Sequence, residues 1–513
     1  MSCLYCAMLL ACAASTQSSG PVALVRDALA RGQKNVKVPR GVYEIVPDGE
    51  GSAYFSFVGL KDVTIDFGGS ELRGKVRTRM FDVEGCTNLT VRNVVIDYDE
   101  LPFTQARIER IDADRNWDVR VLTGYPRPDS GVKGGGLDSH DLFWPIQAYD
   151  ASTHELKNPM RFRDGVAIVR TGVDTYRITG GEDRTGDVGD IAVWSVKEPG
   201  RETAANCIEA RRCEDLVWED ITEYSTPHGI AFVDWESSRT TYRRCRIVRR
   251  SPEADFAPRE VPRLRSGNHD AFISKNAYVG PRILDCIAEY HCDDCVNISG
   301  AYQVVYEGSN DIVRVFVHGK WDLQLEAGDM CQLLTPGGLT PPDVRVVSVA
   351  PGPAVRPDEG AYLAGIGLWP GIAEKMRKSY VLKLDRAVNL PRGTLIASTR
   401  RMGDGFLIRG CRFGSTRARG LLLKASHGCV EDCRIERDVS IRTEYEWLSA
   451  GIARDVVFTN CTFGGGFSLG GNAAKGRRLP SSVNSGIVVD GIEGVNWDDN
   501  SENPFERERK KGK

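Results

Sequence analysis

The segments Phe406-Leu-Ile-Arg-Gly-Cys-Arg-Phe413, Cys429-Val-Glu-Asp-Cys-Arg-Ile435 and Asp455-Val-Val-Phe-Thr-Asn-Cys-Thr-Phe463 share one short pattern. A few apolar residues are followed by Gly, Asp or Asn, and a cysteine then opens a second short apolar run. Val430 and Val456 occupy equivalent places 26 residues apart. Each unit is too short to be stable alone, and turn-forming residues divide it. The pattern therefore predicts short strands that stack from one repeat to the next.

The same kind of unit occurs throughout the earlier part of the chain. Its copies are Val63-Thr-Ile-Asp-Phe67, Leu89-Thr-Val-Arg-Asn-Val-Val-Ile96, Leu216-Val-Trp-Glu-Asp-Ile221, Thr241-Tyr-Arg-Arg-Cys-Arg-Ile247 and Arg282-Ile-Leu-Asp-Cys-Ile287. A period of about 20–30 residues is typical of solenoids. Leucine-rich repeats have a similar period, but their leucine ladder is absent. We therefore expect an all-β fold, a right-handed parallel β-helix.

Two regions interrupt the period, and both contain strand-like runs with many glycines and prolines. We interpret residues 101–200 and 302–400 as small β-barrels inserted into the coil. A helical pattern from Val22 to Ala30 is expected to cap the open first rung, whose edge groups are otherwise unpaired. The predicted division is a leader (1–20), the first part of the β-helix with its capping helix (21–100), an inserted barrel (101–200), the central β-helix (201–301), a second inserted barrel (302–400), the last part of the β-helix (401–495) and a charged tail (496–513).

The first residues have the composition of an export signal. Cys3 to Ala14 is apolar but too short to span a bilayer. Leu9-Leu-Ala-Cys12 resembles a bacterial lipoprotein cleavage box, with Cys12 as the lipidated residue, although the usual basic residues before it are missing. The sequence thus predicts an exported protein, periplasmic or held at the cell surface by a lipid, otherwise secreted. The net charge of −3 gives no electrostatic reason to expect nucleic-acid binding.

Fifteen cysteines occur in the chain, three of them in the leader. Cysteines at one fixed place of the repeat suit a small buried side chain better than disulfides; these are Cys245, Cys286, Cys411, Cys433 and Cys461. Cys292 and Cys295 form a Cys-x-x-Cys pair, but no second pair follows at a useful distance, so we expect no zinc site. No cofactor and no metal are expected.

Asp293 and Asp294 are the residues that point most directly to chemistry. Asp270 lies 23 residues upstream, about one repeat, so it should lie beside the pair on the neighbouring rung. Three crowded carboxylates cannot all ionise cheaply, and one should keep a proton near neutral pH. An isolated Asp-Asp is usually a turn, but this spacing favours a catalytic cluster of the kind that glycosidases use. Because neighbours in a strand point to opposite faces, both can serve only where the chain bends.

Several further segments occur together along the chain: Asp99-Glu-Leu-Pro-Phe-Thr-Gln105, Gly280-Pro-Arg-Ile-Leu-Asp-Cys286 before Asp293-Asp294, Gly420-Leu-Leu-Leu423, and Glu444-Tyr-Glu-Trp-Leu-Ser-Ala-Gly451 with Arg454-Asp-Val-Val-Phe458. In these segments and their order the chain resembles glycoside hydrolase family 110, the α-1,3-galactosidases. The resemblance covers roughly residues 21–490. It departs from the family pattern at His269-Asp270-Ala271 and at Ser449, where the family has Ala-Asp-Gly and a glutamate. These departures bear on which sugar is bound more than on the hydrolysis reaction.

The resemblance implies a metal-independent, exo-acting, inverting α-galactosidase whose catalytic aspartates are Asp270, Asp293 and Asp294. Its substrate is an oligosaccharide or polysaccharide with terminal α-galactose. An inverting hydrolase needs an acid for the leaving oxygen and a base for water. We assign Asp294 as the acid, with Asp270 and Asp293 holding the water. The candidate sugar contacts, each equally explicable as a surface or packing residue, are Lys275, Asn297, Arg419, Lys424 and Trp447.

Three alternatives remain open. A polygalacturonase-like hydrolase of uronate polymers is suggested by Asn268-His-Asp270 and Asp293-Asp-Cys-Val-Asn-Ile-Ser-Gly300, although no Arg-x-Lys triplet follows at the expected distance. A non-catalytic glycan-binding β-helix would use the aspartates only as turn residues. A calcium-dependent lyase would need carboxylates with a basic catalyst, and no segment marks that arrangement.

Overall fold

The computed structural model describes residues 20–47, 53–128, 146–157, 167–180, 185–196, 205–319, 322–369 and 371–489. The predicted lipidation residue Cys12 and the charged tail (496–513) lie outside the described residues, as does the predicted leader except for Gly20. Within the described ranges, no helix is long and apolar enough to cross a membrane.

The fold is built mainly of β-strands, and its largest element is a parallel sheet of 16 strands. Its strands are β1 (Asn35–Lys37), β2 (Val42–Ile45), β4 (Lys61–Gly74), β6 (Thr87–Tyr98), β14 (Val217–Glu223), β16 (Thr241–Arg243), β17 (Arg246–Ile247), β19 (Arg282–Leu284), β20 (Ile287–Ala288), β28 (Leu407–Arg409), β29 (Arg412–Phe413), β31 (Cys429–Glu431), β32 (Arg434–Ile435), β35 (Arg454–Thr459), β36 (Thr462–Phe463) and β39 (Ser485–Val489).

A second sheet of 11 strands is parallel over most of its length, and antiparallel pairs involve only its short strands β34 and β38. Its strands are β3 (Phe55–Val58), β5 (Phe81–Glu84), β13 (Ile208–Arg211), β15 (Phe232–Trp235), β18 (Phe272–Lys275), β21 (Val296–Ala301), β30 (Leu421–Leu423), β33 (Val439–Glu444), β34 (Ser449–Ala450), β37 (Phe467–Asn472) and β38 (Arg478–Leu479).

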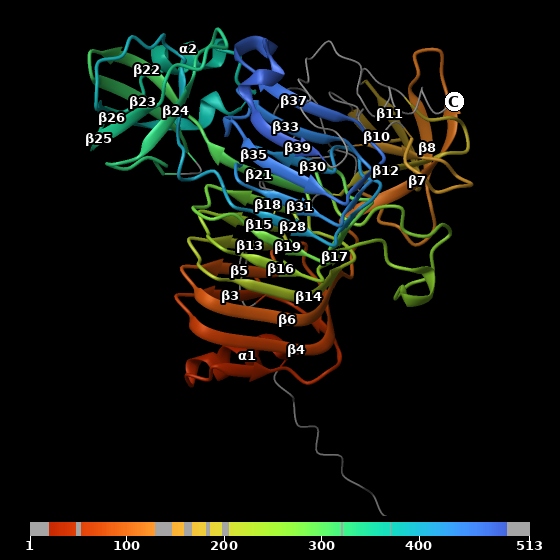
Figure 1. Ribbon diagram of the computed structural model, residues 1–513. Helices are drawn as coiled ribbons and strands as arrows, with labels where there is room; N and C mark the ends of the chain where they lie inside the picture. Colours follow the sequence, from red (N-terminus) through yellow and green to blue (C-terminus); the bar gives the residue numbers. More distant parts are fainter. Residues whose placement is uncertain are drawn as a thin grey trace, which may run out of the picture.

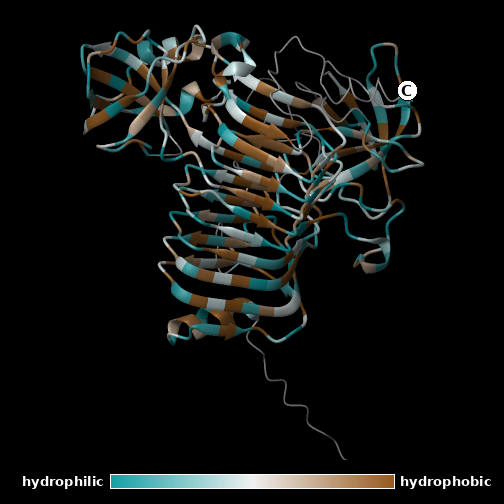
Figure 2. Ribbon diagram, in the orientation of Figure 1, coloured by the Kyte–Doolittle hydropathy of each residue, from teal (hydrophilic) through white to brown (hydrophobic). Residues whose placement is uncertain are grey.

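The chain passes alternately from one parallel sheet to the other, so each turn of chain adds a strand to both (Figure 1). Figure 2 shows apolar residues alternating along the strands, and along β4 buried and less buried positions alternate in the same way, with Val63, Ile65 and Phe67 in the hydrophobic core. Identical side chains stack there: the rings of Phe232 and Phe272, on paired strands, lie 5.2 Å apart and nearly parallel. The helix α1 (Pro21–Ala30) begins the described chain and packs Val25 and Ala28 onto this core, as predicted for a cap.

The corners of the stack use residues that tolerate a left-handed backbone. Asn88 and Asp62 both have positive φ, and the Asn88 amide donates a hydrogen bond to Asp62 one rung away at 2.8 Å. Asn460 and Asp432 repeat the arrangement at 2.6 Å. Short polar side chains favour this conformation because they bond to nearby backbone and side-chain groups. The turn signals of the sequence therefore mark real corners.

The cysteines form the predicted column. Cys286 donates its backbone N–H to the Sγ of Cys411, and Cys411 donates its own to the Sγ of Cys433, each at 3.4 Å. All twelve described cysteines are free thiols, and ten of them are buried. Cys292 contacts Gln147 rather than its Cys-x-x-Cys partner, since its thiol donates to the Gln147 amide oxygen at 3.0 Å.

Two small antiparallel barrels flank the stack on opposite sides in Figure 1. The first contains β7 (Phe103–Ile111), β8 (Trp117–Val121), β9 (Gln147–Tyr149), β10 (Ala167–Arg170), β11 (Thr175–Thr179) and β12 (Ile191–Ser195). The second contains β22 (Gln303–Ser309), β23 (Ile312–His318), β24 (Met330–Leu334), β25 (Val344–Pro351), β26 (Met376–Leu384) and β27 (Leu395–Ser398), with the helix α2 (Pro357–Gly365). Both lie inside the ranges that the sequence predicted for insertions.

The first barrel is tied to the stack close to the aspartate segment. The buried Arg265 guanidinium donates to the Val193 carbonyl at 3.1 Å and to the Gln147 side chain at 2.7 Å, both in the first barrel. The Asn268 side chain donates to the Pro102 carbonyl at 3.0 Å. These contacts fix the backbone immediately before Asp270.

Asp234 and Glu223 are buried carboxyl residues of the stack whose pKa values are raised. Asp234 on β15 accepts hydrogen bonds from Tyr242 at 3.0 Å and from Ser274 at 3.2 Å, and burial raises its pKa to about 7. Burial also raises the pKa of Glu223, at the end of β14, to about 8. Both groups therefore hold a proton through much of the acidic range.

Candidate active site

The register of the second sheet aligns two of the predicted aspartates. Phe272 of β18 pairs with Val296 of β21, so Asp270 and Asp294 each lie two residues before a paired position. The Ala271 N–H donates to the Asp294 carbonyl at 3.0 Å, which continues the ladder to this point. The structure therefore brings together on neighbouring rungs two residues that the sequence separates by one repeat.

Asp293 joins them because the chain is bent before β21. The His269 Nδ1 lies 2.5 Å from the Asp270 Oδ2, and ligand atoms of His269, Asp270 and Asp293 all lie within 4.8 Å of one another. The Asp293 carboxylate pairs with Arg417 at 3.0 Å, while Asp270 is almost fully buried. The bend thus allows adjacent residues to serve the same site.

Asp294 belongs to a second network that the sequence did not predict. The Arg419 Nε donates to the Asp294 Oδ1 at 2.9 Å, and the Arg419 Nη1 pairs with Glu444 at 3.1 Å. Glu444 also lies 3.2 Å from the Lys424 Nζ, and the Lys424 side chain has no exposed surface. Two of the predicted sugar-contacting residues, Arg419 and Lys424, are therefore already paired to carboxylates.

The three aspartates have carboxyl groups whose pKa values move in different directions. Burial raises the pKa of Asp294 to about 7, against the opposing charge of Arg419. Burial likewise raises the pKa of Asp270, and the charge of Asp293 adds to the rise. For Asp293 itself, burial is outweighed by Arg417 and other cations, so its pKa lies below the usual value. Asp293 is thus held ionised, whereas the pKa of each neighbouring carboxyl is shifted upwards, towards the protonated form.

The outer face of the same strands forms a floor beside the aspartates. Lys275 of β18 pairs in register with Ser299 of β21, and Lys424 follows on the next rung, after Leu423, which pairs with Ile298. Burial, and then the charge of Lys424, lowers the pKa of Lys275 to about 7. Asn297 lies on this floor, and its Oδ1 is buried without a hydrogen-bond partner among the described residues. Two predicted contacts, Lys275 and Asn297, thus face one surface.

Trp447 lies in the turn between β33 and β34, directly after the Glu444 segment. Its ring stacks on Trp369 of the second insertion, with centroids 4.3 Å apart and planes inclined by 20°. About a third of Trp447 is exposed. The aromatic surface that the sequence predicted is therefore shared between the stack and an inserted barrel.

Sequence reasoning missed Arg417, Glu444 and His269 as members of the site. A signal for Arg417 and Arg419 was present, because Leu421 occupies the same place in the repeat as Val296. Aligning the repeats would have set both arginines beside Asp293 and Asp294. Glu444 gave no such signal, since its role depends on contacts from Arg419 and Lys424.

The cluster of His269, Asp270 and Asp293 also has the ligand types of a divalent cation site. The Arg417 guanidinium next to Asp293 opposes that use, because it places a fixed positive charge where a cation would lie. Asp270 already has His269 as a hydrogen-bonding partner, and Asp293 already has Arg417 as its ion-pair partner. The donor set therefore fits a metal-independent site better than a metal centre.

Comparison with known proteins adds no assignment to this geometry. No family model matches the chain, and no curated protein matches it.

Proposed function

We propose that this protein is an inverting glycoside hydrolase built on a right-handed parallel β-helix with two barrel insertions. The observation that carries the proposal is the convergence of Asp270, Asp293 and Asp294, with one carboxyl held ionised and another favouring its proton. Acid–base pairs whose environments separate their pKa values are what glycoside hydrolysis needs. An exposed turn would leave the three groups with ordinary values.

Each aspartate has a distinct part in this proposal. Asp294, protonated near neutral pH, donates its proton to the glycosidic oxygen as the bond to the anomeric carbon breaks. Asp293 and Asp270 hold a water on the opposite face of the sugar, and one of them takes its proton as the oxygen attacks. The products are a sugar with inverted anomeric configuration and a free hydroxyl on the remaining glycan.

The proposed substrate is an oligosaccharide or polysaccharide with terminal α-linked galactose, released one unit at a time. This part rests on the resemblance to the α-1,3-galactosidases. Exo action is supported by the barrels on either side of the aspartate segment, since Arg265 joins it to the first and Trp369 brings the second onto Trp447. Such insertions close a groove into a pocket.

A hydrolase of uronate polymers is the second candidate, favoured by one observation. Lys275, Lys424 and Arg442 follow one another along the outer face of β18, β30 and β33, and a row of cations suits a carboxylated sugar. Glu444 offsets this charge through its ion pair with Lys424. The neutral galactoside therefore remains the first candidate.

Export is part of the proposal. The apolar segment at Cys3–Ala14 and the box at Cys12 suggest that the protein works in the periplasm, at the cell surface on a lipid, or as a secreted protein. The partner in each case is a glycan outside the cytoplasm.

A substrate screen tests the function directly. The full chain is incubated with nitrophenyl α- and β-glycosides, α-1,3-linked galactosyl oligosaccharides and polygalacturonate, and the first product anomer is read by NMR. We expect β-galactose from α-galactosides, with the same rate after EDTA treatment. Glycan binding without turnover of any substrate would contradict the proposal, and a rapid fall in polygalacturonate viscosity would favour the second candidate.

A further inference from the structure

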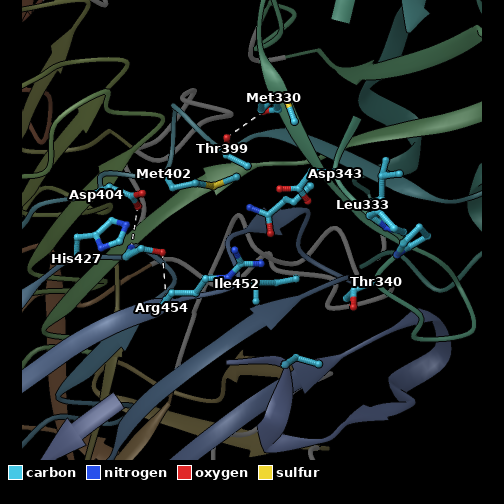
Figure 3. Close-up of a pocket in the computed structure, with 15 residues that line it drawn as sticks. Met330, Leu333, Thr340, Asp343, Thr399, Met402, Asp404, His427, Ile452 and Arg454 are labelled. Carbon is cyan, nitrogen blue, oxygen red and sulfur yellow. Dashed lines mark hydrogen bonds between the residues drawn. The ribbon is translucent and has the colours of Figure 1, made fainter. Parts of the chain in front are cut away.

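A cavity of about 660 Å³ lies between the second barrel and the stack. Its barrel side is formed by β24, by the turn before β25 and by the end of β27. Its stack side is formed by the turns that contain Asp404 and His427 and by Arg454 at the start of β35. Figure 3 shows Asp404 and His427 on one side of the space and Asp343 and Leu333 on the other. The volume falls within the range of about 300–1,000 Å³ usual for small-molecule sites, which often lie at domain junctions.

This cavity is separate from the aspartate cluster. Asp294 and Arg419 precede the paired strands β21 and β30, whereas Ser426 and His427 follow β30. The two sites therefore lie at opposite ends of the same strands. A ligand in the cavity would not contact the proposed reacting atoms.

Unused hydrogen-bond acceptors face the cavity. Gln332 is nearly fully buried, and its Oε1 has no hydrogen-bond partner among the described residues. The Asp343 carboxylate is half-buried beside the Arg454 and Arg386 guanidinium groups, whose charges oppose the rise in its pKa that burial causes. Asp404 accepts the Ser426 N–H at 2.8 Å through only one of its oxygens. A buried polar atom left without a partner is costly, so the Gln332 Oε1 indicates a ligand that donates a hydrogen bond there, and the carboxylate oxygens of Asp343 and Asp404 can accept further ones.

The remaining lining narrows the ligand class. The Thr340 hydroxyl can donate and accept, the Thr399 hydroxyl already donates to the Met330 carbonyl at 3.1 Å and can accept, and Arg454 adds a donor. Apolar surface comes from Met330, Leu333, Pro341, Pro342, Met402 and Ile452. The two carboxylates would repel a phosphate or a carboxylate, and the polar groups are too many for a lipid. A neutral sugar offers hydroxyl donors around its edge and an apolar face.

We propose that this cavity is a second, non-catalytic binding site for a short neutral saccharide. Sugar hydroxyls donate to Gln332, Asp343 and Asp404, and the apolar face of a ring packs on Met330 and Met402. The site holds a glycan chain to the protein at a distance from the aspartates. It goes beyond the proposed hydrolysis and does not depend on it.

Methionine methyl signals provide a local readout of binding. The full chain carrying Asp294→Asn, which slows turnover, is labelled at its methionine methyls and titrated with the neutral saccharides α-1,3-galactobiose, lactose, maltotriose and mannotriose, and separately with the cationic sugar glucosamine. We expect at least one of these saccharides to shift the signals of Met330 and Met402, assigned through Met→Leu variants. Shifts with glucosamine alone would mean that the site recognises a cation, and would overturn the proposal.

A matched pair of variants tests whether binding occurs in the cavity. Thr340 is exposed and lines the cavity, so Thr340→Trp fills its mouth without disturbing the core; Leu339→Trp adds the same group next to it, on a side chain that is 71% exposed. We expect Thr340→Trp to weaken binding at least about tenfold, because the indole occupies the space that the saccharide needs, and Leu339→Trp to leave binding unchanged. Asp343→Asn should weaken binding to a similar extent.

The outcomes separate this proposal from the hydrolase. If no saccharide moves either methyl signal, or if Thr340→Trp binds as well as its parent, the second site does not exist, whatever the hydrolysis assays give. If the methyl signals move but no glycoside is hydrolysed by the unmodified protein, the hydrolase proposal fails and the second site stands.

Discussion

Arg419 contacts a single oxygen of Asp294 with two donors, its backbone N–H at 3.1 Å and its Nε at 2.9 Å. Both reach Oδ1, which leaves Oδ2 to carry a proton. The carboxyl is thus held in one orientation and still favours protonation, because burial raises its pKa to about 7. A fixed, protonated carboxyl is what a general acid requires.

Asp294→Asn tests this assignment. The amide keeps the shape of the side chain but cannot donate a proton to the leaving group, so we expect kcat to fall by about 10²–10⁴-fold with normal folding. In the unmodified enzyme the rate should fall as pH rises through about 7, since only the protonated acid is active, and this limb should vanish in the variant. Near-full activity of the variant on a substrate with a poor leaving group would show that Asp294 is not the acid.

Glu444→Gln is expected to change both activity and stability. The charge of Glu444 helps to raise the pKa of Asp294, so its removal should move the basic limb of the pH–rate profile to lower pH. It also leaves Lys424 buried without its carboxylate, which costs roughly 3–5 kcal/mol of unfolding free energy. This loss of unfolding free energy should become smaller at high pH, where Lys424 is deprotonated and no longer needs a carboxylate partner.

A matched control for Glu444→Gln is Asp322→Asn, which removes the exposed partner of Lys378. Surface pairs contribute about 0–1 kcal/mol, so denaturant unfolding should scarcely change. Equal losses of unfolding free energy in the two variants would mean that burial does not increase the contribution of the Glu444 ion pairs to stability.

Asp234→Asn tests the buried carboxyl inside the stack. An aspartic acid in the unfolded chain has its ordinary pKa of 3.8, whereas Asp234 in the folded chain has a pKa of about 7. Below the lower value both states hold the proton, and between the two values only the folded chain keeps it. Stability is therefore lost as pH rises through this window, by at most about 1.4 kcal/mol per pH unit, and the loss is constant above it.

We accordingly expect Asp234→Asn to be more stable than its parent at pH 8, with the advantage shrinking towards pH 4. Thermal melts of the two proteins at both pH values provide the measurement. A difference of equal size at pH 4 and pH 8 would contradict the assignment of a raised pKa to Asp234.

The column of cysteines predicts that oxidation has no part in stability. Thiol titration of the unfolded protein without reductant should find all twelve described cysteines free, and dithiothreitol should not change the melting temperature. Cys411→Ser should destabilise more than Cys429→Ser, because Cys411 is buried between two rungs and Cys429 is partly exposed. A fall in melting temperature on reduction would indicate a disulfide.

The sequence by itself determined the stacked strands, the corners, the cysteine column and the alignment of Asp270 with Asp294. All of these follow from a local pattern repeated at a nearly constant period, so aligning one repeat with the next predicts which residues contact each other. The two insertions were also visible, because they break that period at residues 101–200 and 302–400.

Only the tertiary structure decided which charges meet at the aspartates. Arg419 is 125 residues from Asp294 along the chain, with a whole barrel between them, and its pairing with Glu444 depends on how long side chains fold over the sheet. The Trp369–Trp447 stack and the cavity at Gln332 likewise lie where a barrel meets the stack. The barrels do not follow the repeat of the stack, so contacts between a barrel and the stack leave no repeated pattern in the sequence. Burial in the folded chain then sets the pKa values that distinguish one aspartate from another.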